Sequence, residues 1–382
     1  MPSSGEILAR LVGFNTVSRE PNEELIRYVA GDLRNVGWGV RALPGRHPGK
    51  FNMLASIGPA GGDGIILSGH SDVVPTDGQT WATDPFTLTR RGAKLYGRGA
   101  VDMKGFIACA LALATRIPGR TLKQPLHIAL SHDEEIGCVG VRTMLTTLAQ
   151  EGFAARGCII GEPTGLRVAC GHKGKISGCI CCRGQAAHSA NPALGCNAIY
   201  LAAGMIGELR DLQTWLRDHG AHDAAYAVPY STVHVGTIKG GTVLNVVPES
   251  CDFSFELRLL PGDDPHFLLR RLEDAAMRIS APETVAGHHA SIEINEQNRY
   301  PGLDTAPDAG VAALAGMASG HAGAIKIDFG SEAGLFSEQL RIDSIVCGPG
   351  MIDRAHKPDE FITQDELDHC DSFLDRIAAT LV

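Results

Sequence analysis

Short apolar runs that alternate with helical segments constrain the fold of this chain most strongly. Residues 65–67, 126–130 and 158–160 have the length and the flanking Gly and Pro residues of buried strands. Helical patterns at 22–37 and 106–117 alternate with them. This order is typical of an α/β domain with a largely parallel sheet, and such sheets gather ligands at the carboxyl ends of their strands.

The order of elements changes between residues 175 and 293. The expected elements there are strands at 175–183, 231–238, 244–259 and 291–294 and helices at 193–219 and 264–279. This order suggests a compact α+β unit with an antiparallel sheet, inserted between two parts of the first domain. The alternating pattern resumes after it, so we predict a discontinuous domain at 1–174 and 294–382 and an inserted domain at 175–293.

Composition and charge exclude several classes of partner. The chain has 382 residues, 44% of them hydrophobic, and a formal net charge of −9, which argues against binding to nucleic acid or an anionic membrane surface. The first residues lack the basic and apolar regions of a signal peptide, and the longest apolar run, 106–114, is too short to span a bilayer. We therefore expect a cytoplasmic protein.

Eleven cysteines lie within apolar stretches rather than at regular spacings. Buried, reduced thiols of a cytosolic protein explain this distribution best. The run Cys179-Ile180-Cys181-Cys182 has two interpretations, a soft-metal site or a strand of small apolar residues. The strand is favoured because no second pair of cysteines lies at the spacing of a zinc finger.

Five separated histidines and carboxylates are candidate metal ligands. They are His70, Asp102, Glu135, Glu162 and His356, and several of them follow predicted strands. Imidazole and carboxylate ligands suit zinc, with cobalt or manganese as alternatives. Two histidines and three carboxylates exceed the needs of one catalytic zinc ion but fit two ions that share a bridging carboxylate.

Two further carboxylates accompany these ligands. Asp72 lies two residues after His70, on the same face of a strand, where it can hold the imidazole in one tautomer. Glu134 adjoins Glu135, so one can bind metal while the other acts as a base. Taken singly, the Glu134-Glu135 pair suits a solvated turn, and His356 suits an ordinary loop. Their joint occurrence favours metal-assisted hydrolysis.

Five stretches of the chain resemble motifs of the M20 metallopeptidase/deacylase family. They are residues 68–75, 97–105, 133–137, 161–164 and 355–358. The resemblance implies a catalytic domain like that of zinc peptidases, which would be the discontinuous domain predicted above. It also implies two zinc ions, for which cobalt can substitute, held by His70, Asp102 and Glu162 and by Asp102, Glu135 and His356.

The same resemblance implies roles for other residues. Asp72 would orient His70, and Glu134 would act as general base and then as general acid. The inserted domain at 175–293 would be a lid that mediates formation of a homodimer. Within it, His188 would reach the active site of the partner subunit and stabilise the oxyanion. Without the resemblance, a lone histidine at this place is more often structural.

Three residues match positions that would bind substrate, namely Asn245, Arg258 and Glu332. Arg258 would hold the substrate carboxylate through two hydrogen bonds, although a surface arginine on a strand is an equally good interpretation. Glu332 would recognise a free amine of the substrate, or would simply interact with a helix dipole. The segments at 329–336 and 346–350 are similar to those of the acetylornithine deacetylase subgroup.

These features predict a dinuclear zinc amidohydrolase that cleaves the amide of an N-acyl amino acid. The resemblance implies N2-acetyl-L-ornithine as substrate, with ornithine and acetate as products in arginine biosynthesis. One alternative is another M20-type enzyme, such as a succinyl-diaminopimelate desuccinylase, an aminoacylase or a dipeptidase. The alternative from another class is a catalytically silent metal-binding scaffold, against which the intact Glu134 argues.

Overall fold

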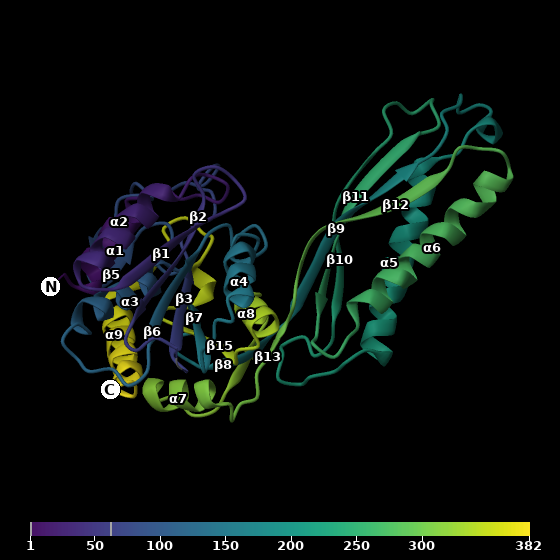
Figure 1. Ribbon diagram of the computed structural model, residues 1–382. Helices are drawn as coiled ribbons and strands as arrows, with labels where there is room; N and C mark the ends of the chain where they lie inside the picture. Colours follow the sequence, from purple (N-terminus) through teal and green to yellow (C-terminus); the bar gives the residue numbers. More distant parts are fainter. Residues whose placement is uncertain (1, 62) are drawn as a thin grey trace. The chain divides into compact units, whose positions relative to one another are not determined.

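The computed structural model describes residues 2–61 and 63–382, which form two compact units (Figure 1). The first unit contains the described residues up to His172 together with Leu303–Ile327 and Ser331–Val382. The second unit contains Lys173–Gly302 and Asp328–Gly330. It therefore ends later than the predicted residue 293, because strand β12 (Ser291–Tyr300) continues in the same sheet.

A mixed sheet forms the centre of the first unit. Within the described residues its order is β1 (Gly39–Pro44), β2 (Phe51–Ile57), β6 (Leu126–Ser131), β3 (Ile65–His70), β7 (Gly157–Pro163), β15 (Ser344–Gly348), β8 (Ala169–His172) and β13 (Leu303–Asp304), with β14 (Ile325–Ile327) paired to β8. The central strands β6, β3, β7 and β15 are parallel. This confirms the predicted α/β class. Strand β1 was not predicted, because none of its residues is buried and its sequence lacks an apolar run.

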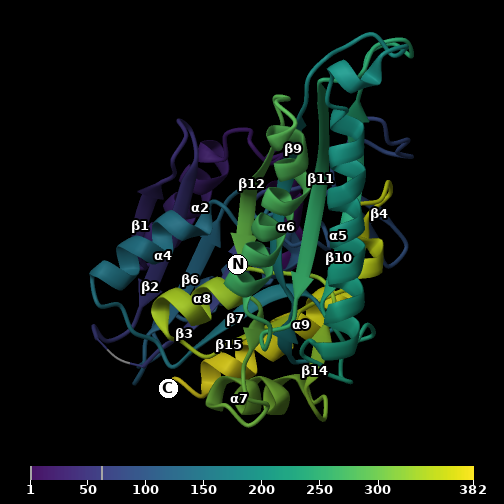
Figure 2. The same cartoon turned by 90° about the vertical axis from the view of Figure 1, so that its right-hand side faces the viewer.

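Helices cover both faces of this sheet. They are α1 (Ser4–Val12), α2 (Glu23–Asn35), α3 (Lys104–Arg116), α4 (Val141–Gln150), α7 (Gly310–Ser319), α8 (Ala333–Leu340) and α9 (Gln364–Ala379). Helix α3 packs between α1 and α9, while α4 packs against α8 on the other side of the sheet (Figures 1 and 2). Helix α4 begins only at Val141, because the preceding Gly137 and Cys138 have left-handed backbone angles.

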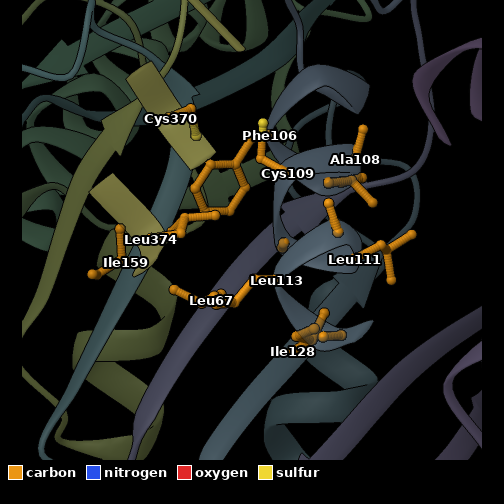
Figure 3. Close-up of a cluster of buried hydrophobic side chains, with 14 of the residues drawn as sticks. Leu67, Phe106, Ala108, Cys109, Leu111, Leu113, Ile128, Ile159, Cys370 and Leu374 are labelled. Carbon is orange, nitrogen blue, oxygen red and sulfur yellow. The ribbon is translucent and has the colours of Figure 1, made fainter. Parts of the chain in front are cut away.

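The core of the first unit holds part of the candidate site in place. Figure 3 shows Phe106 of α3 beside Cys370 and Leu374 of α9. A Cβ atom on Gly161 of β7 would lie 1.9 Å from Cγ of Phe106, so only glycine permits this packing. Helix α3 thus packs directly against Gly161. This close packing fixes the position of the next residue in the strand, Glu162.

The second unit consists of one sheet and two long helices. Its strands, in the order β10 (Thr232–Gly240), β11 (Ser250–Leu259), β9 (Gly174–Arg183) and β12, are all antiparallel. Helices α5 (Ala198–His219) and α6 (Pro265–Val285) cover one face of this sheet (Figure 1). Strand β9 alternates, so that Cys182 faces the helices while Cys179 and Cys181 face the other way. The run 179–182 is therefore part of a strand.

Two predicted boundaries in the second unit are displaced. Helix α5 begins at Ala198 rather than at 193, because Asn197 caps it by accepting the N–H of Ile199. Strand β11 begins at Ser250 rather than at 244, because the residues around Pro248 form a loop. Both differences arise from local turn chemistry, which the hydrophobic pattern does not report.

Strands β16 (Phe361–Thr363), β5 (Lys94–Tyr96) and β4 (Thr89–Arg91) form a small separate sheet.

All eleven cysteines are free thiols, and nine of them are buried. Among the described residues, no helix combines the length and the apolar character that crossing a membrane requires.

Buried His127 in β6 should make the first unit sensitive to acid. Its Nδ1 lies 2.7 Å from Oγ of Ser56, its ring packs edge-on against Phe153, and burial lowers its pKa to about 4. The unfolded chain, with a pKa near 6.5, therefore binds more protons, and stability is lost as the pH falls from about 6.5 to about 4. At pH 5 the expected loss is about 2 kcal/mol.

Urea unfolding of the metal-free protein at pH 7.5 and pH 5 measures this effect. The His127→Gln variant should lose about 2 kcal/mol less than the parent between the two pH values. Equal losses in the two proteins would show that His127 does not contribute to acid sensitivity.

Candidate active site

Five candidate ligands meet at the carboxyl edge of the parallel strands. His70 is the last residue of β3, Glu162 lies near the end of β7, Glu135 follows β6, His356 lies in the loop after β15, and Asp102 lies in the turn before α3. Because parallel strands end at a common edge, groups that are far apart in the sequence come together there.

These residues form two groups that share Asp102. The ligand atoms of His70, Asp102 and Glu162 all lie within 4.8 Å of one another, and so do those of Asp102, Glu135 and His356. Nε2 of His70 is 3.1 Å from Oδ1 of Asp102, whereas Nε2 of His356 is 3.1 Å from Oδ2 of the same carboxylate. Asp102 therefore presents one oxygen to each group, as a bridging ligand does.

The charges of the cluster also suit divalent cations. Burial, together with the charge of Asp102, raises the pKa values of Glu135 and Glu162 to about 7. Hydrogen bonds to Asp102 and Glu135 raise the pKa of His356 to about 10. The buried carboxylates therefore repel one another and compete for protons and imidazoles. A divalent cation would remove this repulsion, and imidazole with carboxylate is a donor set that zinc accepts.

Asp72 contributes to the site through both its backbone and its side chain. Nδ1 of His70 lies 2.9 Å from the carbonyl oxygen of Asp72 and 3.6 Å from its carboxylate, so the ring hydrogen-bonds to the carbonyl. Nε2 of His70 then faces the cluster. The Asp72 carboxylate accepts hydrogen bonds from the N–H groups of Glu134 and Glu135 and from Oγ of Ser18, at 3.1, 3.3 and 2.7 Å. It thus holds the backbone of both glutamates.

Glu134 is the candidate base beside the cluster. Burial, with a smaller contribution from the charges of Glu162 and Glu135, raises its pKa well above the ordinary value. The thiol of Cys138 lies 3.1 Å from Oε1 of Glu134 and donates a hydrogen bond to it. Cys138 and Ser18 were not predicted to take part in the site. Cys138 directly follows the recognisable stretch at 133–137, whereas no signal marks Ser18.

Glu332 lies beside the cluster at the start of α8. Its side chain is 1% exposed and makes no capping hydrogen bond to that helix. Burial raises its pKa to about 8, and its Oε1 has no hydrogen-bond partner within the described part of the chain. Both interpretations of Glu332, as a group that reads the substrate and as a carboxylate at a helix N-terminus, are compatible with this position.

The other candidate residues belong to the second unit. His188 is exposed and pairs with Val246, and its Nδ1 accepts the N–H of Ala190. The carbonyl of Asn245 accepts the N–H of Ser189, so His188 and Asn245 lie on neighbouring loops. The guanidinium of Arg258 donates to Glu256 at 2.7 Å and to the hydroxyl of Tyr300 at 3.0 Å.

Comparisons with known proteins agree on one family. A sequence model of Peptidase family M20/M25/M40 matches residues 66–380. The chain is also 36% identical, over 371 residues, to the acetylornithine deacetylase of Klebsiella pneumoniae (strain 342), a match that covers 95% of this chain and 93% of that protein. The protein is therefore a hydrolase of the M20 peptidase family.

Solved structures of other proteins share this fold. An M20 family metallo-carboxypeptidase from Sulfolobus solfataricus superimposes with a TM-score of 0.78 at 19% identity, covering 99% of both chains. A tripeptidase from Staphylococcus aureus superimposes with a TM-score of 0.74 at 18% identity, covering 98% of this chain and 96% of the other. At such identities the likeness concerns the fold alone.

Proposed function

We propose that this hydrolase is a dinuclear zinc enzyme that removes the acyl group from an N-acyl amino acid, with N2-acetyl-L-ornithine as its preferred substrate. The observation that carries the proposal is the pair of three-residue groups that share Asp102. The choice of substrate is supported by the 36% identity to a deacetylase over nearly the whole chain. The free cysteines suit a reducing compartment, as expected of a cytoplasmic enzyme of arginine biosynthesis.

The five clustered side chains would hold the metal ions. His70 and Glu162 would bind one ion, Glu135 and His356 the other, and Asp102 both. When bound, two divalent ions supply positive charge that polarises the amide carbonyl and lowers the pKa of a nearby water. Imidazole and carboxylate donors suit zinc, and cobalt accepts the same donors.

Glu134 would move the proton in both halves of the reaction. It accepts a proton from the water whose oxygen forms a bond to the acyl carbon. It then donates this proton to the amine nitrogen as the carbon–nitrogen bond breaks, so that acetate and ornithine leave. The backbone N–H of Glu134 donates a hydrogen bond to Asp72, and Cys138 donates one to the Glu134 carboxylate. Both support this role, because they hold the base in one orientation.

The second unit would serve as the lid and the dimer interface. Its edge strand β10 exposes Ile238, and the following loop exposes Val243 and Leu244, which suits a surface that a second copy covers. His188 of one subunit would donate to the carbonyl oxygen of a substrate bound by its partner. Light scattering tests the dimer, and a monomeric mass at micromolar concentration would contradict it.

Arg258, Asn245 and Glu332 would bind the substrate. Arg258 would bind the α-carboxylate of the substrate, and Asn245 would contribute a polar contact. Glu332 would bind the amine of the substrate side chain. Glu332→Gln tests the last role. The variant should prefer acetylornithine over neutral acyl amino acids less strongly than the parent does, and an unchanged preference would remove Glu332 from substrate recognition.

The thiol of Cys138 should assist Glu134. Cys138→Ala removes the hydrogen bond to Oε1, whereas Cys138→Ser keeps a donor at the same place. A hydrogen bond worth about 1 kcal/mol corresponds to a decrease of about fivefold in kcat for the alanine variant, with the serine variant closer to the parent. Steady-state kinetics with metal content as a control measures this, and equal rates for both variants would contradict the role.

A comparison of substrates tests the proposed function as a whole. The values of kcat/KM for N2-acetyl-L-ornithine, N-succinyl-diaminopimelate and a set of dipeptides should be highest for the first. A preference for one of the others would keep the site but change the substrate within the family. No turnover of any of them, with two metal ions bound, would favour a catalytically silent scaffold.

A further inference from the structure

One buried carboxylate holds the turn that carries Asp102. Glu360 is 1% exposed, and its Oε1 accepts the N–H groups of Val101 and Asp102 at 2.9 and 3.2 Å. Its Oε2 accepts the N–H of Gly99 at 3.1 Å and Nη1 of Arg98 at 2.8 Å. The backbone that leads into the shared ligand, from Gly99 to Asp102, is thus fixed by a single side chain from a distant part of the sequence.

The guanidinium of Arg98 extends this network to the loop that carries His356. Arg98 is 1% exposed, and its Nη1 also donates to the carbonyl of Lys357 at 3.3 Å. Its Nη2 donates to Oε1 of Gln79 at 2.5 Å, and Nε2 of Gln79 donates to the carbonyl of His356 at 3.0 Å. Arg98 and Gln79 therefore connect the backbone of His356 to Glu360 and the Asp102 turn.

His356 needs such support more than the other histidine does. Its side chain is 51% exposed, and its backbone φ of 61° lies in the left-handed region that non-glycine residues rarely adopt. His70 and Glu162, in contrast, lie on the paired parallel strands β3 and β7. One candidate metal group is thus built largely on the sheet, whereas the residues of the other lie in three separate turns or loops.

We infer that Glu360, Arg98 and Gln79 are positioning residues that set the distance between Asp102 and His356. They thereby determine how tightly the group formed by Asp102, Glu135 and His356 binds its ion. This inference rests on the proposed metal centre and adds an asymmetry to it. The ion bound with His356 depends on the whole network, whereas the ion bound with His70 and Glu162 depends on the sheet and, through Asp102, on Glu360.

Two variants separate this role from a general role in folding. Glu360→Gln removes the buried negative charge and leaves Arg98 without its charged partner, which destabilises the fold as well as the site. Gln79 is only partly buried, and Gln79→Met removes the link to His356 while Arg98 keeps Glu360 and the carbonyl of Lys357 as partners. Loss of a group that orients a metal ligand typically weakens binding by about 10- to 100-fold.

Gln213 in the second unit provides a matched control. Its amide also connects two backbone groups, since it donates to the carbonyl of Ser231 at 3.3 Å and accepts the N–H of Val233 at 2.7 Å. Gln213→Met therefore removes the same chemistry from a place that holds no candidate ligand. It should leave the binding of both ions unchanged.

The experiment is a titration of metal-free protein with Zn²⁺ in competition with a chromophoric chelator. We expect two binding events for the parent and the Gln213→Met control. In Gln79→Met, one event should be weaker by about tenfold and the other unchanged. Glu360→Gln should weaken both events, because Glu360 also holds the turn of the shared ligand Asp102. If Glu360→Gln does not fold, Gln79→Met decides the question.

Two results distinguish failure of the inference from failure of the proposed function. A parent protein that binds fewer than two ions would overturn the metal centre itself. A parent that binds two ions, with the same two affinities in Gln79→Met, would overturn the positioning role and leave the centre intact. A lower melting temperature of Gln79→Met with unchanged affinities would likewise show that the network only stabilises the fold.

Discussion

Glu134→Gln should lower kcat for N2-acetyl-L-ornithine by about 10³-fold while the metal content stays unchanged. The amide can neither accept the proton of the attacking water nor return it to the leaving amine, and such acid–base contributions are worth about 10²- to 10⁴-fold. The effect should fall on kcat rather than on KM, because proton transfer occurs in the transition state. Acetate release under saturating substrate, with metal analysis of the same sample, measures it.

The neighbouring residue provides the control for this variant. Glu135→Gln makes the same chemical change one position later, in a side chain that is 3.0 Å from Nε2 of His356 and belongs to a candidate metal group. It should reduce both activity and bound metal, whereas Glu134→Gln should reduce activity alone. A Glu134→Gln enzyme with near-parental kcat would remove Glu134 from the mechanism.

Asp102→Asn should weaken the binding of both metal ions. The two carboxylate oxygens of Asp102 face different histidines, and asparagine keeps only one oxygen and no charge. Because even residues that only orient a ligand contribute about 10- to 100-fold, loss of a shared ligand should weaken binding by more than about 100-fold. Dialysis against a weak chelator followed by metal analysis should show fewer than two ions per chain.

A surface variant separates this effect from a simple loss of charge. Asp304 is largely exposed and pairs with Lys326 at 2.9 Å, so Asp304→Asn changes the net charge equally without touching the cluster. It should bind two ions as the parent does. If Asp102→Asn also kept two ions at parental affinity, Asp102 would not be a bridging ligand.

Much of the first unit could be predicted from the sequence because its central strands are continuous apolar runs. β3, β6 and β7 are buried over their whole length, and such runs are conspicuous in a sequence. The convergence of His70 and Glu162 followed from this prediction, since parallel strands end at one edge. Strand β1 was missed for the opposite reason, because it is too exposed to leave an apolar pattern.

The contacts that hold the candidate site together could not be predicted. Ser18 binds the carboxylate of Asp72, and Glu360 binds the backbone of Asp102, across long separations in sequence. No local pattern marks such pairs, because they arise from the packing of whole elements. The orientation of His70 likewise differs from the simple expectation, since its ring hydrogen-bonds to the carbonyl of Asp72 rather than to the carboxylate.

Release of acetate from N2-acetyl-L-ornithine by chelated and metal-restored protein tests the central claim most directly. We predict no release from the metal-free protein and full recovery of activity after addition of two equivalents of zinc or cobalt per chain. Release at an unchanged rate from the metal-free protein would contradict a metal-dependent reaction. No release from protein that holds two ions would contradict the assignment of acetylornithine as the substrate.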